Sequence, residues 1–348
     1  RWKKTHAEEN EEQQKKRFKI EVVEEDEPKN TAFSNRLDYC SFRSALTGGG
    51  VTLETVLIPA GKFIMGTPKL VEPKDTVFSG QLILVLAGSA AFAFIVIIVT
   101  RSIHRRRRPQ VSLRWLLVFV VMVGVAMLGA FRCWESTKAW RRYELAKRVG
   151  SNERPAHEVT LTTPFYISKF ETTQEQYELV MGINRSRFKG SDLPVERFTW
   201  EELQAFCKKV SEKTRQTVRL PTEAQWEYAC RAGTSTAYSS GDEYADLDRI
   251  GWYAANSQNT MHPVGQKEPN AWGVYDMHGN VWEHCQDWYE EYKHGAVVDP
   301  EGPPQGETRV LRGGSWDFSA GYCRSTFRHL AFNGFAGFRV VVEVMKKP

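Results

Sequence analysis

The chain has 348 residues, a formal net charge of +5 and six cysteines at scattered positions. So mild a charge argues against a nucleic-acid-binding surface. No Cys-x-x-Cys pair occurs, which argues against a disulfide framework or a structural zinc site. The length accommodates one large domain or two of ordinary size.

Residues 1–50 are rich in charged side chains, poor in apolar ones, and end in Gly48-Gly49-Gly50. A segment with so few apolar residues cannot bury enough surface to offset the entropy of ordering it. We therefore interpret it as a flexible linker to a domain upstream. The next segment, 51–77, contains two β-prone runs that meet at Pro59-Ala60-Gly61, and this pattern predicts a β-hairpin at the start of the main domain.

Two uncharged, strongly apolar runs follow, at 78–100 and 115–131. At ~1.5 Å of rise per residue, the first is long enough to cross the ~30 Å hydrocarbon core of a bilayer. The second is shorter, but Trp115 and Trp134 flank it as aromatic anchors for the interface. We predict a transmembrane hairpin over 78–132. The alternative is a pair of buried core helices, which the lack of an amphipathic stripe disfavours.

The loop between the two runs carries Arg105 to Arg108 among other arginines. Basic loops favour the cytoplasmic side, so both flanking segments are expected on the outer, periplasmic or extracytoplasmic, face. Further basic residues follow the second run in a juxtamembrane linker at 133–152, so the charge pattern is not one-sided. The lipid bilayer is the expected partner of this part of the chain.

The main part of the domain is assigned to 153–348. Strands are expected near His157, over 164–170 and over 338–344. Residues 233–337 show little periodicity and much Gly, Trp, Tyr and Asn. Three helices are expected to begin at capping boxes, in Thr172-Thr173-Gln174-Glu175, Thr199-x-x-Glu202 and Thr222-x-x-Gln225.

Four motifs in this half occur in a characteristic order: Arg219–Glu227, Gly273–Glu283, Arg312–Trp316 and Gly337–Arg339. Together they resemble the formylglycine-generating enzyme family, also called the sulfatase-modifying-factor domain. The resemblance implies an α+β, C-type-lectin-like fold with little regular secondary structure.

The stretch from Ile58 to Gly66 resembles the opening of the same domain, so the resemblance covers 51–66 and 153–344. The two-helix transmembrane hairpin is then expected to interrupt the domain. An even number of spans returns the chain to the same side of the membrane, where the two pieces of the domain can join.

The resemblance also implies a site for oxidation chemistry. In the oxidase members two thiolates, five positions apart, bind copper(I), a metal that soft sulfur ligands suit. Here Cys323 matches the second thiol, Tyr322 its neighbour and Ser315 the serine of the Gly-Gly-Ser, but Phe318 replaces the first thiol. A phenyl ring binds no metal, so the copper site and the catalytic roles of Cys323, Ser315 and Tyr322 are in doubt. The alternative for Cys323 is a small buried hydrophobe.

Some family members bridge the positions of Cys207 and Cys230 to partners further along the chain. Those partner positions are Val340 and Arg328 here, so both thiols are expected to stay reduced.

A calcium site is implied in the Gly273–Glu283 motif. By position its ligands are the side chains of Asp276 and Glu283 and the carbonyls of Gly279 and Val281. Calcium prefers such hard oxygen donors. The alternative is a structural turn whose carboxylates accept backbone N–H groups.

Three functions follow from these observations. The first is a membrane-anchored binding or accessory module, without the oxidase site, that recognises a protein, peptide or glycan. The second is an active oxidase that converts a cysteine of a protein substrate and uses Cys323 with a substituted first ligand. The third is the sensor domain of a larger signalling protein.

Overall fold

The computed structural model of the chain describes residues 19–23, 41–47, 52–67, 151–331 and 336–344, with the single positions 124 and 127. The chain divides into two compact units, residues 1–69 with 150–348 and residues 70–149. The two runs predicted to span a membrane, 78–100 and 115–131, lie outside the described residues apart from the two single positions. Among the residues that are described, no helix is long and apolar enough to cross a bilayer.

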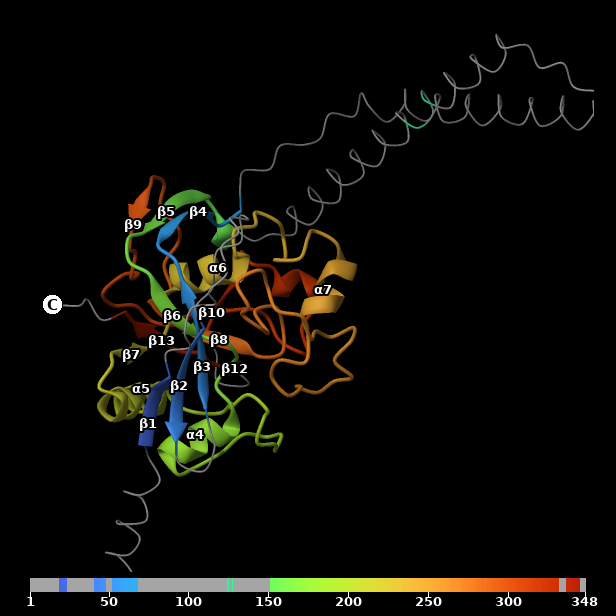
Figure 1. Cartoon of the computed structure of the whole chain (residues 1–348). Coiled ribbons are helices and arrows are strands. Elements are labelled where there is room, and N and C mark those ends of the chain that lie inside the picture. The colour runs from blue at the N-terminus through green and yellow to red at the C-terminus, as the bar shows by residue number, and fades with distance from the viewer. Residues whose placement is uncertain are drawn as a thin grey trace, which may run out of the picture. The chain divides into compact units, whose positions relative to one another are not determined.

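Three small sheets form the first unit, and short helices pack around them (Figure 1). The largest sheet has the order β1-β2-β3-β6-β13-β7, the second β11-β10-β8-β12, and the third β4-β5-β9. The strands of the largest sheet are β1 Lys19–Val23, β2 Ser41–Thr47, β3 Leu53–Ile58, β6 Phe165–Ser168, β13 Val341–Glu343 and β7 Val218–Arg219. The other strands are β4 Gly61–Met65, β5 His157–Leu161, β8 Trp282–Trp288, β9 Val297–Val298, β10 Arg309–Arg312, β11 Arg328–Leu330 and β12 Ala336–Gly337.

The hairpin predicted at Pro59-Ala60-Gly61 does not form, although both runs are strands. β3 pairs antiparallel with β6, whereas β4 pairs antiparallel with β5, so the chain passes from one sheet to another at Pro59. Each run pairs with a strand that follows residue 150, and the two runs do not pair with each other. Figure 1 shows this mixing, with the blue β3 and β4 beside the green β6 and β5. A Cβ at Gly61 would lie 2.2 Å from the Tyr228 hydroxyl, so glycine permits the close approach where β4 begins.

Part of the expected linker at 1–50 is also paired. β1 and β2 form an antiparallel pair, and β2 pairs with β3 at the edge of the largest sheet. The first four residues of Lys19–Val23 alternate polar and apolar side chains, a period that suits a strand, whereas Ser41–Thr47 shows no such alternation. The local pattern therefore did not predict this pair of strands.

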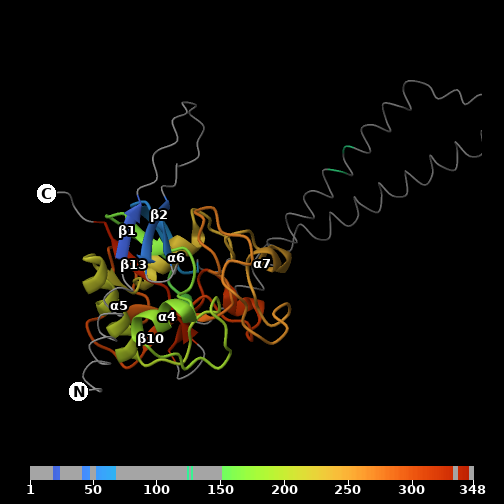
Figure 2. The same cartoon turned by 60° about the horizontal axis from the view of Figure 1, so that its bottom comes forward.

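The helices of the described chain begin at capping boxes. They are α4 Gln174–Met181, α5 Trp200–Thr214, α6 Glu223–Arg231 and α7 Tyr244–Ile250. Capping boxes at Thr199 and Thr222 are confirmed, whereas the first box is Thr173 with Gln176, one residue later than expected. α4 and α5 lie together beside the largest sheet (Figure 2).

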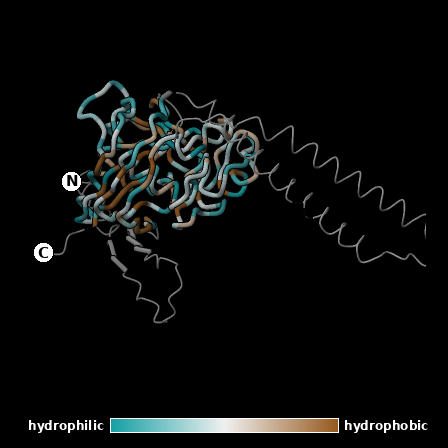
Figure 3. Tube along the Cα trace, turned by 90° about the horizontal axis from the view of Figure 1, so that it is seen from above, coloured by the Kyte–Doolittle hydropathy of each residue, from teal (hydrophilic) through white to brown (hydrophobic). Residues whose placement is uncertain are grey.

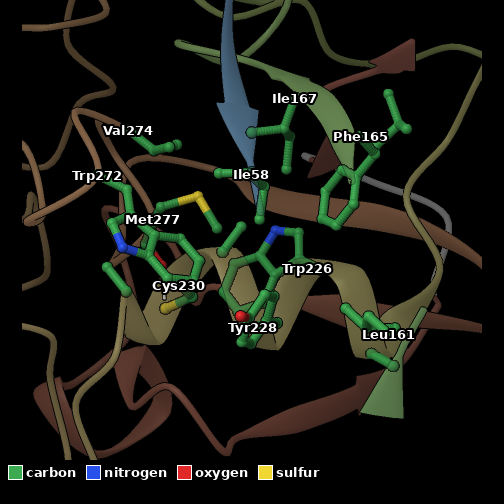
Figure 4. Packing of buried hydrophobic residues seen from close by; sticks show 14 of the residues in the cluster. Ile58, Leu161, Phe165, Ile167, Trp226, Tyr228, Cys230, Trp272, Val274 and Met277 are labelled. Carbon is green, nitrogen blue, oxygen red and sulfur yellow. Dashed lines mark hydrogen bonds between the residues drawn. The ribbon is translucent and has the colours of Figure 1, made fainter. Parts of the chain in front are cut away.

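The main hydrophobic core lies between β3, β6 and α6. Side chains such as Ile58 and Ile167 from the sheet converge on Trp226 and Tyr228 of α6 (Figure 4). A second core packs α4 and α5 against the sheet through Tyr177 and Phe206, among others. The hydrophobic stretches of the described chain lie mostly inside the fold, and hydrophilic stretches follow its outer loops (Figure 3).

A network of buried ion pairs surrounds α6. We call Glu223, Glu227, Arg231, Arg312 and Arg328 the arginine network. Arg328 pairs with Glu223 (Nη2–Oε2 2.6 Å), Arg231 with Glu227 (Nη2–Oε1 2.9 Å), and Arg312 contacts both carboxylates. These side chains are almost wholly inaccessible to solvent, so each charge depends on its partners.

The residues on either side of the 70–149 unit are tied to this interior. Thr67 donates its backbone N–H to the Glu153 carbonyl (2.8 Å) and its hydroxyl to the Glu153 carboxylate (2.8 Å). The buried Glu153 in turn pairs with Arg324 (2.8 Å), and Gly66 donates to Glu227 (3.0 Å). Thr67 and Glu153, which lie on either side of residues 70–149 in the sequence, are therefore joined by hydrogen bonds.

Candidate functional site

The Arg312–Trp316 motif ends β10 and turns back on itself. Gly313 and Gly314 have φ values of 94° and 79°, a backbone region that suits glycine. A Cβ at Gly314 would lie 2.6 Å from the Cys323 sulfur, so the glycine also lets the backbone approach the thiol. The following segment ends in a short 3₁₀ helix, Ala320–Cys323, that carries Cys323 into the interior.

Cys323 lies in an apolar environment. It is fully buried and packs in a small cluster that includes Tyr238, Leu247, Ile250 and Tyr253. Burial raises the pKa of its thiol to about 12. The thiolate is the form that binds metals and attacks electrophiles, and burial disfavours that form here.

Phe318, at the position of the missing thiol, belongs to a different cluster. Its ring contacts Trp282 edge-on (centroids 5.3 Å apart) and also packs against Tyr322 (5.1 Å). Tyr322 continues to Phe327 (4.9 Å) and is 38% exposed. We call Trp282, Phe318, Tyr322 and Phe327 the aromatic cluster.

Ser315, the third expected catalytic residue, is buried, and its hydroxyl donates to Asp317 (2.5 Å). In the described part of the chain, no other cysteine belongs to the cluster around Cys323. All four described cysteines, Cys207 and Cys230 among them, are free and buried. These donors do not fit a two-thiolate copper(I) site.

One buried group near Cys323 was missed by the sequence reasoning. His278 accepts from the backbone N–H of Ser239 at Nε2 (3.1 Å), and its Nδ1 donates to the Cys323 carbonyl (2.7 Å). Burial lowers its pKa to about 4, so the ring is neutral. Its Nε2 also lies 3.5 Å from the Cys230 sulfur. His278 therefore holds the backbone carbonyl of Cys323 in place. The sequence signal that could have identified it is its position inside the Gly273–Glu283 motif.

The expected calcium residues lie beside a second buried charge cluster. We call Glu171, Asp276, Glu283 and Arg339 the carboxylate cluster. Arg339 binds both oxygens of Glu283 (Nε–Oε2 and Nη2–Oε1, each 2.7 Å), and the Trp226 indole also donates to Glu283 (2.7 Å). Glu171, which the sequence reasoning did not select, accepts from the Asn280 amide (2.6 Å) and the Val281 N–H (3.2 Å).

Asp276 is the member with an unused oxygen. Its Oδ2 accepts from Gly265 N–H (2.7 Å), whereas Oδ1 is buried and has no hydrogen-bond partner. Burial raises the pKa of Asp276 to about 6. Burial, and next the charges of Asp276 and Glu283, also raise the pKa of Glu171 well above its ordinary value.

The backbone around these residues is tightly turned. Asp276, Gly279 and Asn280 have φ values of 57°, 93° and 58°, and a Cβ at Gly279 would lie 2.0 Å from the Trp252 carbonyl oxygen. One guanidinium cannot neutralise three carboxylates, and Oδ1 of Asp276 is buried without a hydrogen-bond partner. The oxygen donors present are of the type that calcium prefers. Among the described residues, no three His, Cys, Asp or Glu side chains are grouped to hold a metal ion, so the backbone carbonyls of Gly279 and Val281 would have to complete the site.

The fold and these two sites define an α+β domain of the formylglycine-generating type in which a phenyl ring stands where the first thiol is expected. The sequence agrees. Residues 128–344, more than half of the chain, match the sulfatase-modifying factor enzyme 1-like domain, and the chain belongs to that family.

Relatives within this family carry different names. The chain is 29% identical over 257 residues to the chaperone protein LppX of Paenibacillus barcinonensis, which covers 58% of this chain and 88% of that protein. It is 37% identical over 144 residues to the formylglycine-generating enzyme of Streptomyces coelicolor, where the match spans 37% of this chain and 44% of the enzyme. A match of 37% identity over 160 residues to the serine/threonine-protein kinase pkn1 of Chlamydia pneumoniae spans 43% of this chain and only 24% of the kinase.

Solved structures show the same fold. Treponema denticola variable protein 1 superposes with a TM-score of 0.54 at 31% identity, over 57% of this chain and 90% of that one. PvdO from Pseudomonas aeruginosa superposes with a TM-score of 0.53 at 23% identity, over 84% and 95% respectively, which indicates the fold alone.

Proposed function

We propose that this protein is a binding or accessory module of the sulfatase-modifying-factor family rather than a copper oxidase. One observation carries the proposal: Phe318 fills the first-thiol position as part of an aromatic cluster, while Cys323 is buried in a separate apolar cluster. A copper(I) oxidase of this type needs two converging thiolates. The module would recognise a protein or peptide ligand, and the exposed Tyr322 at the edge of the aromatic cluster is one apolar contact available to it.

The similar proteins also support a binding or accessory role. The match to the chaperone protein LppX covers 88% of that protein, and its name describes a chaperone rather than an oxidase. We further propose that residues 78–100 and 115–131 anchor the chain in a membrane and that the domain lies on the outer face. The support is the length and apolarity of these runs.

A second candidate function is that of a sensor domain in a larger signalling protein. The match to a quarter of the Chlamydia pneumoniae kinase favours it, because there the similar region is one part of a longer protein. An active oxidase that uses Cys323 remains the third candidate, and the experiment below addresses it.

We also propose a calcium ion held by the Asp276 and Glu283 carboxylates and the carbonyls of Gly279 and Val281. The ion would offset the excess negative charge of the carboxylate cluster and stiffen the Gly273–Glu283 loop. The unpartnered oxygen of Asp276 supports this assignment. The bound ion would have a structural role.

Copper(I) titration of the full chain tests the main proposal. In competition with a chromophoric copper(I) chelator, the protein is expected to withdraw no stoichiometric copper, and Cys323→Ala is expected to behave identically. Phe318→Cys, which restores the two-thiol pattern, is the matched variant and is expected to gain binding. One equivalent of copper bound by the wild type and lost in Cys323→Ala would overturn the proposal.

A further inference from the structure

The carboxylate cluster contains more negative charge than its guanidinium can balance. Arg339 donates five hydrogen bonds, two to the Glu283 carboxylate and the others to three backbone carbonyls. A guanidinium has five N–H donors, so none is left for Glu171 or Asp276. Neither of these two carboxylates takes part in an ion pair found in the described part of the chain.

The two glutamates of the cluster differ in how many acceptor sites they still offer. A carboxylate has about four lone-pair sites. Glu283 accepts three hydrogen bonds, from the Arg339 guanidinium and the Trp226 indole, and two of them fall on its Oε2. Glu171 accepts one at each oxygen, from the Asn280 amide (2.6 Å) and from the backbone N–H of the residue that follows it (3.2 Å). Glu283 is therefore nearly saturated, whereas each oxygen of Glu171 keeps a site for a further partner.

Glu171 is held alongside the loop that contains the proposed calcium ligands. Two residues before it, the Lys169 carbonyl accepts from the N–H of Tyr275, which precedes Asp276 (2.9 Å). At the other end of the loop, the Glu171 carboxylate binds Asn280, which separates the two residues whose carbonyls would complete the site. The contacts therefore hold Glu171 beside both ends of this loop.

These oxygens have almost no accessible surface, which suits an ion rather than a larger ligand. Oδ1 of Asp276 is buried without a hydrogen-bond partner, and Glu171 is wholly inaccessible to solvent. Calcium ligands lie about 2.3–2.6 Å from the ion. Oxygens at such a spacing exclude a water-sized probe from the gap between them, so inaccessible oxygens can serve as ligands.

We propose that Glu171 is a charged calcium ligand together with Asp276, whereas the main partner of Glu283 is Arg339. The inference rests on the calcium site proposed above and changes its set of charged ligands. Two carboxylates balance the charge of one divalent ion, as the guanidinium balances Glu283. The two loop carbonyls keep their place among the ligands.

Calcium titration of the full chain by calorimetry tests the inference, together with the melting temperature in calcium and in chelator. Glu171→Gln is expected to weaken calcium binding at least about tenfold, because the loss of even an outer-shell partner of a metal costs about 10- to 100-fold. The difference between the two melting temperatures is expected to shrink in the same variant. This difference is the decisive measurement, because a purely structural loss lowers both temperatures alike.

Glu196→Gln is the matched control. Glu196 is also buried, accepts the backbone N–H of Arg187 (2.7 Å) and has one carboxylate oxygen without a hydrogen-bond partner, but it lies outside the carboxylate cluster. This control is expected to bind calcium as tightly as the wild type.

A second variant protects the test against misfolding. Glu171→Asp keeps the charge on a side chain that is one methylene shorter. It is expected to bind calcium more weakly than the wild type and more tightly than Glu171→Gln. Wild-type affinity in Glu171→Asp would contradict the inference.

The outcomes separate this inference from the calcium site itself. A wild type that shows no calcium response would overturn the site and the role of Glu171 with it. A response that Asp276→Asn abolishes and Glu171→Gln keeps in full would leave the site standing and overturn the role of Glu171. Equal losses of affinity in Glu171→Gln and Glu196→Gln would also overturn that role.

Discussion

The two buried charge clusters of this domain differ in their balance of charges. In the arginine network three guanidiniums surround Glu223 and Glu227, whereas in the carboxylate cluster Arg339 alone faces Glu171, Asp276 and Glu283. Burial acts to raise the pKa of Glu227, but the charges of Arg231 and Arg312 outweigh it and hold that pKa below its ordinary value. At Asp276 and Glu171 burial is the larger effect, and it raises the pKa of both carboxyls. The contrast shows that paired guanidiniums favour the ionised form of Glu227, whereas burial favours the protonated form of Asp276 and Glu171.

The largest effect is expected where the arginine network is broken. Arg312→Met leaves two buried carboxylates short of a partner, and the loss of one member of a buried ion pair costs about 3–5 kcal/mol. Equilibrium unfolding in urea measures it. Lys62→Ala, at an exposed pair with Glu158, is the matched control and is expected to cost under about 1 kcal/mol. Equal losses of unfolding free energy in the two variants would show that the buried ion pairs contribute no more stability than the exposed pair.

A second prediction concerns Asp287, a buried carboxyl that accepts from the Glu223 N–H (2.7 Å). It takes part in none of the ion pairs found in the described part of the chain, and burial, with the Glu223 charge next, raises its pKa to about 7. A raised folded-state pKa contributes stability that is present below the unfolded value, 3.8, and lost as the pH rises through about 7. Asp287→Asn keeps the hydrogen-bond acceptor and cannot ionise. It should therefore lose less stability between pH 5 and pH 8, by on the order of 2–4 kcal/mol.

Urea unfolding of both proteins across this pH range measures the difference. Parallel pH profiles for wild type and Asp287→Asn would contradict the rule that an unpaired buried carboxyl stays protonated.

The third prediction tests the cation at the carboxylate cluster. Calcium at about 100 times its dissociation constant should stabilise the fold by about 2.7 kcal/mol, seen as a higher melting temperature that a chelator reverses. Asp276→Asn removes a charged ligand and should abolish the calcium response. Asp192→Asn, at an exposed aspartate, should respond like the wild type. A calcium response that survives in Asp276→Asn would show that the ion binds elsewhere on the protein.

Local features of the fold were predictable from sequence, and non-local ones were not. The capping boxes at Thr199 and Thr222 depend on side chains three residues apart, so the sequence contains the whole interaction. The pairing of β3 with β6 depends on a strand more than a hundred residues away, and a local reading therefore gave a hairpin.

The same distinction holds at the sites. The loss of the first thiol is visible at Phe318 alone, whereas the burial of Cys323 among tyrosines from another part of the chain is not. Arg339 reaches Glu283 across 56 positions, and Glu171 joins Asn280 across 109, so no spacing rule could reveal the carboxylate cluster. The strands of the irregular half were not predicted because β8 buries the charged side chains of Glu283 and Asp287 and β10 has only four residues, so neither shows a clear apolar period.

The most direct test of the central claim is an oxidation assay. The full chain, copper(I), dioxygen and a cysteine-containing peptide are incubated together, and the peptide is examined by mass spectrometry for conversion of its cysteine to the aldehyde. The account predicts that the cysteine is recovered unchanged. Aldehyde that forms with the wild type and disappears with Cys323→Ala would contradict it.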